Sequence, residues 1–254
     1  MWLSWEANRT WDLDSSQSSA VRTQLGQWQG WLQREQMRPF ATWLQTIRQR
    51  LREGPELSPA EVTRWRETLT QWWLPIARHL SPSLIQLAKT LTPAQIEAMR
   101  NRFEDANERW RRDVHPSSAR ARAARREERW NERTSWLFGE LNAQQRELIR
   151  LHVREVASFD ALIEAQRLER QRRISLALAA LPTNEAQFSE MLAGIWLADA
   201  ENADAARQLA LANDAIAARL FAAASPTQRA SLDRRLGNWI EDLNLLAARA
   251  AKSS

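Results

Sequence analysis

The side chains that most often carry catalysis or bind metal ions are few and scattered in this chain. Its 254 residues contain no cysteine, which excludes disulfides, thiolate nucleophiles and cysteine-based metal sites. The three histidines are far apart and at none of the spacings typical of metal ligands; they are His79, His115 and His152. We therefore expect neither a metal ion nor another cofactor.

Acidic residues occur in adjacent pairs, which raises the question of general acid–base catalysis. The pairs are Glu104-Asp105, Glu127-Glu128 and Glu241-Asp242. Neighbours in sequence point in different directions around a helix, so such pairs do not converge on one substrate. The chain also lacks the nucleophile-elbow, P-loop and dinucleotide-binding motifs. We expect a protein that is not an enzyme and has no catalytic residues.

Tryptophan is unusually abundant, with 14 Trp against 6 Phe and no Tyr. Large aromatic side chains usually fill the core between helices, and Trp28 lies on an apolar stripe of its predicted helix. Two adjacent residues such as Trp72 and Trp73, however, cannot both point to one face of a helix. We predict that Trp31, Trp72 and Trp73 contribute to a partly exposed apolar surface that binds a client polypeptide. Core packing is the alternative.

Basic side chains concentrate between residues 109 and 133, where the excess of positive charge equals the +5 of the whole chain. We predict a mostly exposed helix over 119–133 that binds anionic surfaces weakly. The candidate contacts are Arg120, Arg122, Arg125, Arg126 and Arg129. The alternative is a solvated helix crossed by ion pairs between successive turns.

One short phrase recurs five times: an apolar or small residue, a polar capping residue, two spacers, then Gln or Glu. This is the capping box, in which the polar side chain caps the first helical turn and the Gln or Glu bonds back to the cap. The copies are unevenly spaced, which excludes a regular solenoid. They are Leu13–Gln17, Leu57–Glu61, Leu91–Gln95, Leu141–Gln145 and Ala224–Gln228.

These helix starts and the scarcity of glycine predict an all-α fold of nine or ten helices, either a bundle or an open array. Pro39 should separate two helices, and Pro75 should kink or end another. We expect a single elongated domain over residues 1–254. A soft boundary near 182 would separate a Trp- and Arg-rich part (1–181) from Ala-rich C-terminal helices (182–254). No segment reaches the roughly 20 apolar residues of a membrane span.

The order of these elements resembles a family of uncharacterised lipoproteins of Gram-negative bacteria. The matching segments span the chain and are Trp11–Gln17, Leu91–Ile96, Asn107–Trp110, Glu128–Trp130, Leu141–Gln145 and Ser225–Gln228. The resemblance implies a helical envelope protein of no known activity, with a lipoprotein signal and a lipid-modified Cys before the first capped helix. We expect membrane association only through such an N-terminal lipid anchor, which this sequence does not contain.

The Leu-Thr-x-x-Gln form of the phrase, at Leu91–Gln95, is also similar to small periplasmic stress proteins of the Spy and CpxP kind. Those proteins are helical cradles that hold unfolded clients. We therefore expect a non-enzymatic periplasmic protein that binds a protein partner or unfolded client as a chaperone-like factor or scaffold, with the outer membrane as the site of any lipid anchor. The alternative is a cytosolic Arg-rich helical protein that binds nucleic acid or another anionic polymer. Because no nucleic-acid-binding signature is present, nucleic acid is not the expected partner.

Overall fold

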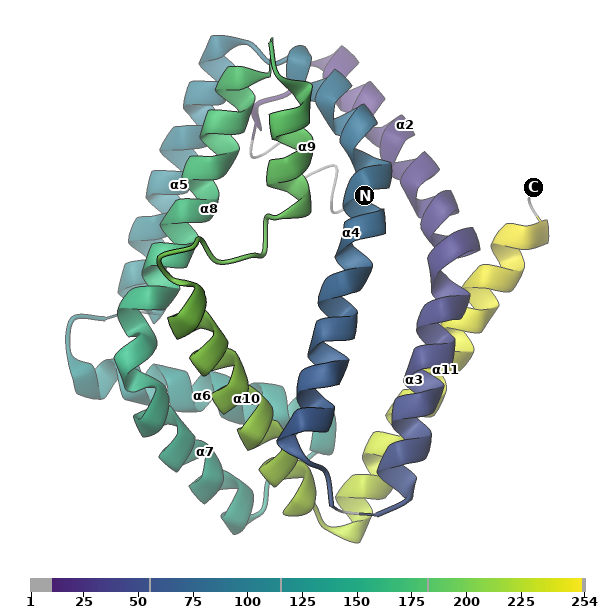
Figure 1. Ribbon diagram of the computed structural model, residues 1–254, viewed down its shortest axis with the longest axis vertical. Coiled ribbons are helices and arrows are strands. Elements are labelled where there is room, and N and C mark those ends of the chain that lie inside the picture. The colour runs from purple at the N-terminus through teal and green to yellow at the C-terminus, as the bar shows by residue number, and fades with distance from the viewer. Residues whose placement is uncertain (1–10, 55, 115, 182, 253–254) are drawn as a thin grey trace. The chain divides into compact units, whose positions relative to one another are not determined.

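The computed structural model describes residues 11–54, 56–114, 116–181 and 183–252. These residues form α-helices joined by short turns, with no strand among them, which confirms the all-α prediction (Figure 1). A π-helical turn (Leu32–Gln36) and a 3-10 turn (Val156–Phe159) supplement the α-helices. The α-helices are α2 (Ser15–Trp31), α3 (Met37–Arg52), α4 (Pro59–Lys89), α5 (Pro93–Val114), α6 (Ala119–Phe138), α7 (Ala143–Glu155), α8 (Asp160–Ala180), α9 (Glu185–Ala193), α10 (Ala203–Ala222) and α11 (Pro226–Lys252).

All five predicted capping boxes are present. In each box the polar side chain accepts a hydrogen bond from the backbone N–H three residues later, and the Gln or Glu side chain accepts one from the backbone N–H of the cap. Each box therefore satisfies two backbone donors at the start of a helix. The pairs are Asp14 with Gln17, Ser58 with Glu61, Thr92 with Gln95, Asn142 with Gln145, and Ser225 with Gln228.

The prediction for Pro39 needs correction, and for Pro75 one of the two predicted outcomes is wrong. Pro39 does not separate two helices, because α2 continues through the π-helical turn into α3 and Pro39 lies in the first turn of α3. The wider π-helical turn interrupts the regular α-helical bonding just where the proline ring would disturb it. Pro75 does not end α4, which continues through Pro75 and Pro82 to Lys89. The buried stripe of α4 begins after Pro75 and runs past Pro82, where tertiary packing offsets the roughly 3 kcal/mol cost of a proline inside a helix. The stripe consists of Ala77, Ser81, Ile85 and Ala88.

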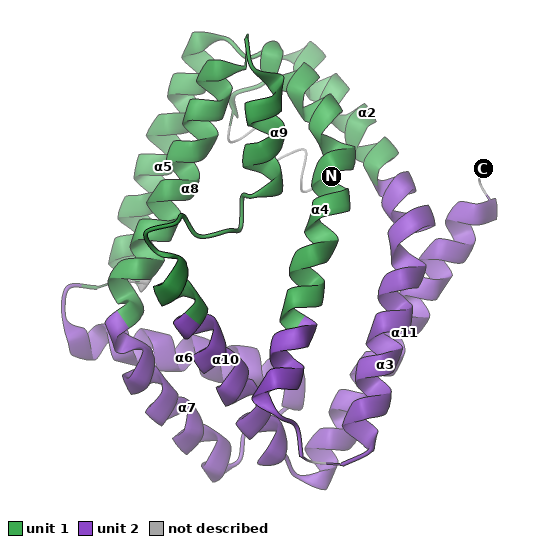
Figure 2. Cartoon of the chain, in the orientation of Figure 1, with its two compact units in different colours: residues 1–28, 66–116, 159–207 green, residues 29–65, 117–158, 208–254 purple. Residues whose placement is uncertain are grey.

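The chain divides into two compact units, each built from three separate segments (Figure 2). Unit 1 comprises residues 1–28, 66–116 and 159–207, and unit 2 comprises residues 29–65, 117–158 and 208–254. This division differs from the expected boundary near 182. The segment 159–207 belongs to unit 1 on both sides of that position, and Pro182 itself lies outside the described residues. The division follows three-dimensional packing between distant segments, which a shift in composition along the chain does not report.

Unit 1 has one apolar core, in which α4, α5, α8 and α9 meet. Met99 of α5 is almost completely buried there, and Phe188 of α9 packs against the same cluster. Burial of side chains of this size contributes about 1.5–3 kcal/mol each. The remaining buried members are Ile85, Ala88, Ala177, Leu178 and Leu181.

Unit 2 has two apolar clusters. The larger one joins α3 to α11, the helix pair with the most extensive contact, and includes Leu44 and Leu236. The second joins α7 to α10, where Ile149 and Ile216 are almost completely buried. The residues that position side chains in this unit thus come from helices far apart in the sequence.

Candidate functional site

The glutamines of the capping boxes do more than begin helices. In unit 1, Gln95 Nε2 donates to Gln17 Oε1 at 2.7 Å, and Gln17 Nε2 also donates to the backbone oxygen of Thr90 at 2.8 Å. In unit 2, Gln228 Nε2 donates to Gln145 Oε1 at 2.8 Å. Each unit therefore joins two helix starts through a pair of side-chain amides, of which Gln17, Gln145 and Gln228 are buried and Gln95 is half-buried.

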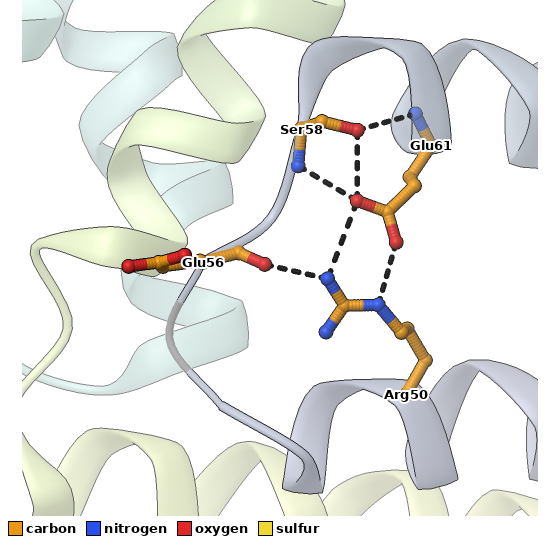
Figure 3. Close-up of polar contacts among 4 residues, drawn as sticks. All are labelled: Arg50, Glu56, Ser58 and Glu61. Carbon is orange, nitrogen blue, oxygen red and sulfur yellow. Dashed lines mark hydrogen bonds and ion pairs between the residues drawn. The ribbon is translucent and has the colours of Figure 1, made fainter.

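The remaining capping box, at the start of α4, ends in Glu rather than Gln, and its carboxylate contacts an arginine (Figure 3). Glu61 accepts from Arg50 Nε at 2.5 Å, and Arg50 Nη2 also donates to the backbone oxygen of Glu56 at 2.6 Å. The bonds from Arg50 and from Ser58 hold the pKa of Glu61 at about 2, below its usual 4.5. This carboxylate is thus fixed as an anion, which suits an ion pair that anchors the start of α4 and not a proton-transfer group.

A second fixed carboxylate joins α3 to α11. Asp233 accepts from Arg48 Nε at 2.9 Å and from Arg52 Nε at 2.6 Å. Both guanidinium groups lower the pKa of Asp233 far below its usual range. Together with Phe221 and Arg229 these residues line a half-open pocket of about 380 Å³. Four arginines line the pocket against the one carboxylate of Asp233, and that carboxylate is committed to the helix pair.

Among the residues that the structure describes, the most exposed aromatic side chains are Trp196 and Trp136, with 64% and 58% of their surface exposed. Trp196 lies in the turn after α9. Its ring centroid is 6.4 Å from that of Trp73 in an edge-to-face arrangement, and the guanidinium carbon of Arg170 lies 5.8 Å from its ring centroid. Trp73 is itself fixed, since its Nε1 donates to the backbone oxygen of Leu192 at 2.9 Å.

Trp136 of α6 repeats this arrangement in unit 2. Its ring stacks on Trp239 of α11 with centroids 5.3 Å apart and an interplanar angle of 20°. The guanidinium carbon of Arg235 lies 5.9 Å from the ring centroid of Trp136. In each unit, then, an exposed tryptophan packs on a half-buried tryptophan and lies within cation–π distance of an arginine. We call these two groups the Trp196 site and the Trp136 site.

Of the three predicted client-binding residues, only one belongs to either of these sites. Trp31, Trp72 and Trp73 are all half-buried. Trp73 belongs to the Trp196 site, whereas Trp31 belongs to unit 2 and Trp72 to unit 1. Sequence reasoning missed Trp136 and Trp196. For Trp196 the available signal was the short turn that follows Gly194, whereas Trp136 is followed by Leu137 and Phe138 and offered no such signal.

The five arginines predicted to contact anionic surfaces differ in exposure. Arg120 and Arg125 are exposed, and Arg125 pairs with Glu128 at 2.9 Å. Arg122 and Arg129 are half-buried. The expectation is wrong for Arg126, which is buried and donates from Nη1 to the backbone oxygen of Val153 at 3.1 Å. Burial against α7 lowers the pKa of Arg126, and the nearby guanidinium groups lower it further.

His152 is the buried histidine of α7. Its Nε2 lies 3.0 Å from Asn213 Oδ1, and its ring meets that of Trp130 edge to face at 4.8 Å. Burial lowers the pKa of His152. Of the other two histidines, His79 is exposed and His115 lies outside the described residues. Within the described part of the chain, no three His, Cys, Asp or Glu side chains are grouped to hold a metal ion.

This fold and these sites define an all-α protein of two units whose distinguishing surface features are exposed Trp–Arg groups. The chain belongs to DUF6279, a family of unknown function, whose model matches residues 10–201. The matched region contains α2 to α9, whereas α10 and α11 follow it. No curated protein and no solved structure matches the chain. None of the described helices has the length and apolar character needed to cross a membrane.

Proposed function

We propose that this protein is a non-enzymatic binding protein of the Gram-negative cell envelope that holds a polypeptide partner in a chaperone-like or scaffolding role. The observation that supports this function is the exposure of Trp196 and Trp136, each next to an arginine. Trp and Arg are the residue types that contribute most to binding energy at protein interfaces. An exposed indole also offers a large contact area at a small cost in side-chain entropy.

The way in which the Trp196 site is held within the protein supports the proposal. Trp196 packs on Trp73, whose indole N–H is already bonded within the protein. Arg173 Nη2 donates to the backbone oxygens of Ile195 and Leu197, which holds the turn that carries Trp196. A surface already held in its binding geometry loses less entropy when a partner arrives.

Apolar side chains extend the Trp196 site. Leu197, next to Trp196, is 56% exposed. On α4, Leu69 is exposed and lies one helical turn before Trp73, and therefore on the same side of that helix. Exposed apolar groups gathered around an aromatic side chain are typical of interaction sites. This grouping favours an apolar segment of a polypeptide as the partner.

The proposed location rests on the resemblance to envelope lipoproteins, including their lipid anchor and periplasmic orientation. Fractionation of cells that express the full gene product would test it. Recovery with the outer membrane or in the periplasm agrees with the proposal, and recovery in the cytosol would favour the alternative of an Arg-rich protein that binds an anionic polymer.

The binding function is tested by the aggregation of an unrelated, chemically unfolded enzyme, measured as light scattering with and without this protein. We expect the wild type to suppress scattering, and the variants Trp196→Ala and Trp136→Ala to suppress it less. Leu176→Ala is the matched control, because Leu176 is exposed on α8 but belongs to neither site. Suppression that is equal in all four proteins, or absent in the wild type, would contradict the proposal.

A further inference from the structure

Three arginines follow one another along α8 beside the Trp196 site. Arg167, Arg170 and Arg173 are spaced three residues apart, which advances them by about 4.5 Å each along the helix axis. Aromatic rings support two of them: Arg167 lies over Trp110 at 5.8 Å, and Arg170 over Trp196 at 5.8 Å. All three are half-buried. We call this set the α8 arginine row.

The arginines of the row have no ion-pair partners among the described residues, although Glu169 is close enough to act electrostatically on Arg173. None of its three guanidinium groups lies within ion-pair distance of a carboxylate among those residues. By contrast, Arg172 on the same helix pairs with Glu169 at 2.6 Å, and Arg111 of α5 pairs with Glu164 at 2.7 Å. Several other arginines of this unit therefore have a carboxylate partner that the arginines of the row lack.

The guanidinium groups of the row are also only partly solvated. Burial lowers the pKa of Arg170, and repulsion from Arg167 and Arg173 lowers it further. The Nε atom of Arg173 is buried and has no hydrogen-bond partner. Holding like charges together with incomplete solvation is unfavourable, and an external anion would relieve both costs.

Resting on the proposed polypeptide-binding function, we infer that the Trp196 site and the α8 arginine row together select an acidic amphipathic segment of a partner protein. The segment's apolar side chain packs on Trp196 and Leu197, while its carboxylates, about one helical turn apart, pair with Arg170 and its neighbours in the row. A helix with Glu or Asp at intervals of three or four residues offers carboxylates at the matching axial spacing.

The surroundings of the row favour a peptide over a sheet of anionic lipid or a polynucleotide. Glu169 lies beside Arg170 in the sequence, and Asp199 is close enough to act electrostatically on Arg172. A planar anionic surface or a continuous phosphate backbone would meet these carboxylates as well as the row. A peptide, whose charges are discrete, can place its carboxylates on the row alone.

The test uses a synthetic helix-forming peptide with a leucine stripe flanked by glutamates, and the same peptide with lysines in place of the glutamates. Binding of each labelled peptide to the full chain is measured by fluorescence anisotropy. We expect the glutamate peptide to bind at least about tenfold more tightly, as charge-assisted contacts imply. Arg170→Gln should remove most of this preference. Arg100→Gln, which makes the same change of charge at an exposed ion pair of α5, should preserve it.

Two outcomes overturn the inference in different ways. If both peptides bind equally and Trp196→Ala weakens both, the acidic preference is wrong while the polypeptide-binding function stands. If neither peptide binds and aggregation is not suppressed, both proposals fail. Binding through Arg170 to phosphatidylglycerol vesicles or to an oligonucleotide, without preference between the peptides, would also overturn the acidic segment as the partner.

Discussion

Gln228 donates from its side-chain amide to Gln145 Oε1 at 2.8 Å, although 83 residues separate the two in the sequence. Each glutamine also closes the capping box of its own helix, α11 and α7 respectively. Gln145 is completely buried and donates from Nε2 to the backbone oxygen of Leu220 at 3.3 Å. One amide thus serves a local helix start and a tertiary contact, so its removal affects both.

Gln145→Ala should therefore cost more than the loss of an ordinary cap. We expect it to lower the free energy of unfolding by about 2–3 kcal/mol, because it leaves buried groups without partners. Ser58→Ala, at an exposed cap, should cost about 1 kcal/mol. Denaturant unfolding of Gln145→Ala, Gln228→Ala and the double variant would give the coupling, which we expect at about 0.5–3 kcal/mol. Strict additivity would show that the amide pair contributes nothing.

The five helix starts were predictable because a capping box is complete within five residues. The pairing of Gln17 with Gln95 and of Gln145 with Gln228 was not, because it depends on which helix starts meet in space. The same limit applies to the prolines: residue preferences predict a kink or an end at Pro75, but whether α4 continues beyond it depends on contacts with distant elements. The tryptophans were recognised as abundant, yet exposure depends on neighbouring elements, and the most exposed ones were missed.

Glu61→Gln should change the response of the protein to acid. In the folded protein the pKa of Glu61 is about 2, against its usual 4.5. The unfolded chain therefore takes up a proton first, and the stability that Glu61 contributes is present above pH 4.5 and lost as the pH falls towards 2. Unfolding midpoints measured across this range should decline less steeply for Glu61→Gln than for the wild type. Glu97→Gln, at an exposed carboxylate of α5, should leave the slope unchanged.

His152 should make the protein sensitive to mild acid. Its pKa lies below the usual 6.5 because the ring is buried. The neutral ring is therefore favoured in the folded state, and stability is lost as the pH falls from 6.5 towards the lowered pKa. His152→Gln, which can still bond to Asn213, should flatten the dependence of the melting temperature between pH 7.5 and about pH 5. The exposed His79 supplies the control: if His79→Gln flattens it equally, His152 is not the group responsible.

The arginines of α6 should divide into two groups. Arg120→Gln and Arg125→Gln should weaken retention on a heparin column, because both side chains are exposed. Arg126→Met should leave retention unchanged and keep or raise the unfolding midpoint, since it replaces a buried, desolvated charge by an apolar side chain of similar length. A loss of retention in Arg126→Met equal to that in Arg120→Gln would contradict the assignment of Arg126 to the interior.

The interleaving of the two units also sets the order in which the protein can be completed during synthesis. All three segments of unit 1 have left the ribosome once residue 207 emerges, whereas unit 2 needs α11, the last helix. Arg48 and Asp233, which join α3 to α11, are 185 residues apart. At translation rates of about 5–20 residues per second, the apolar face of α3 waits roughly 10–40 s for its partner helix. For most of its synthesis, therefore, a nascent chain of this protein carries the apolar face of α3 without the helix that covers it in the folded unit.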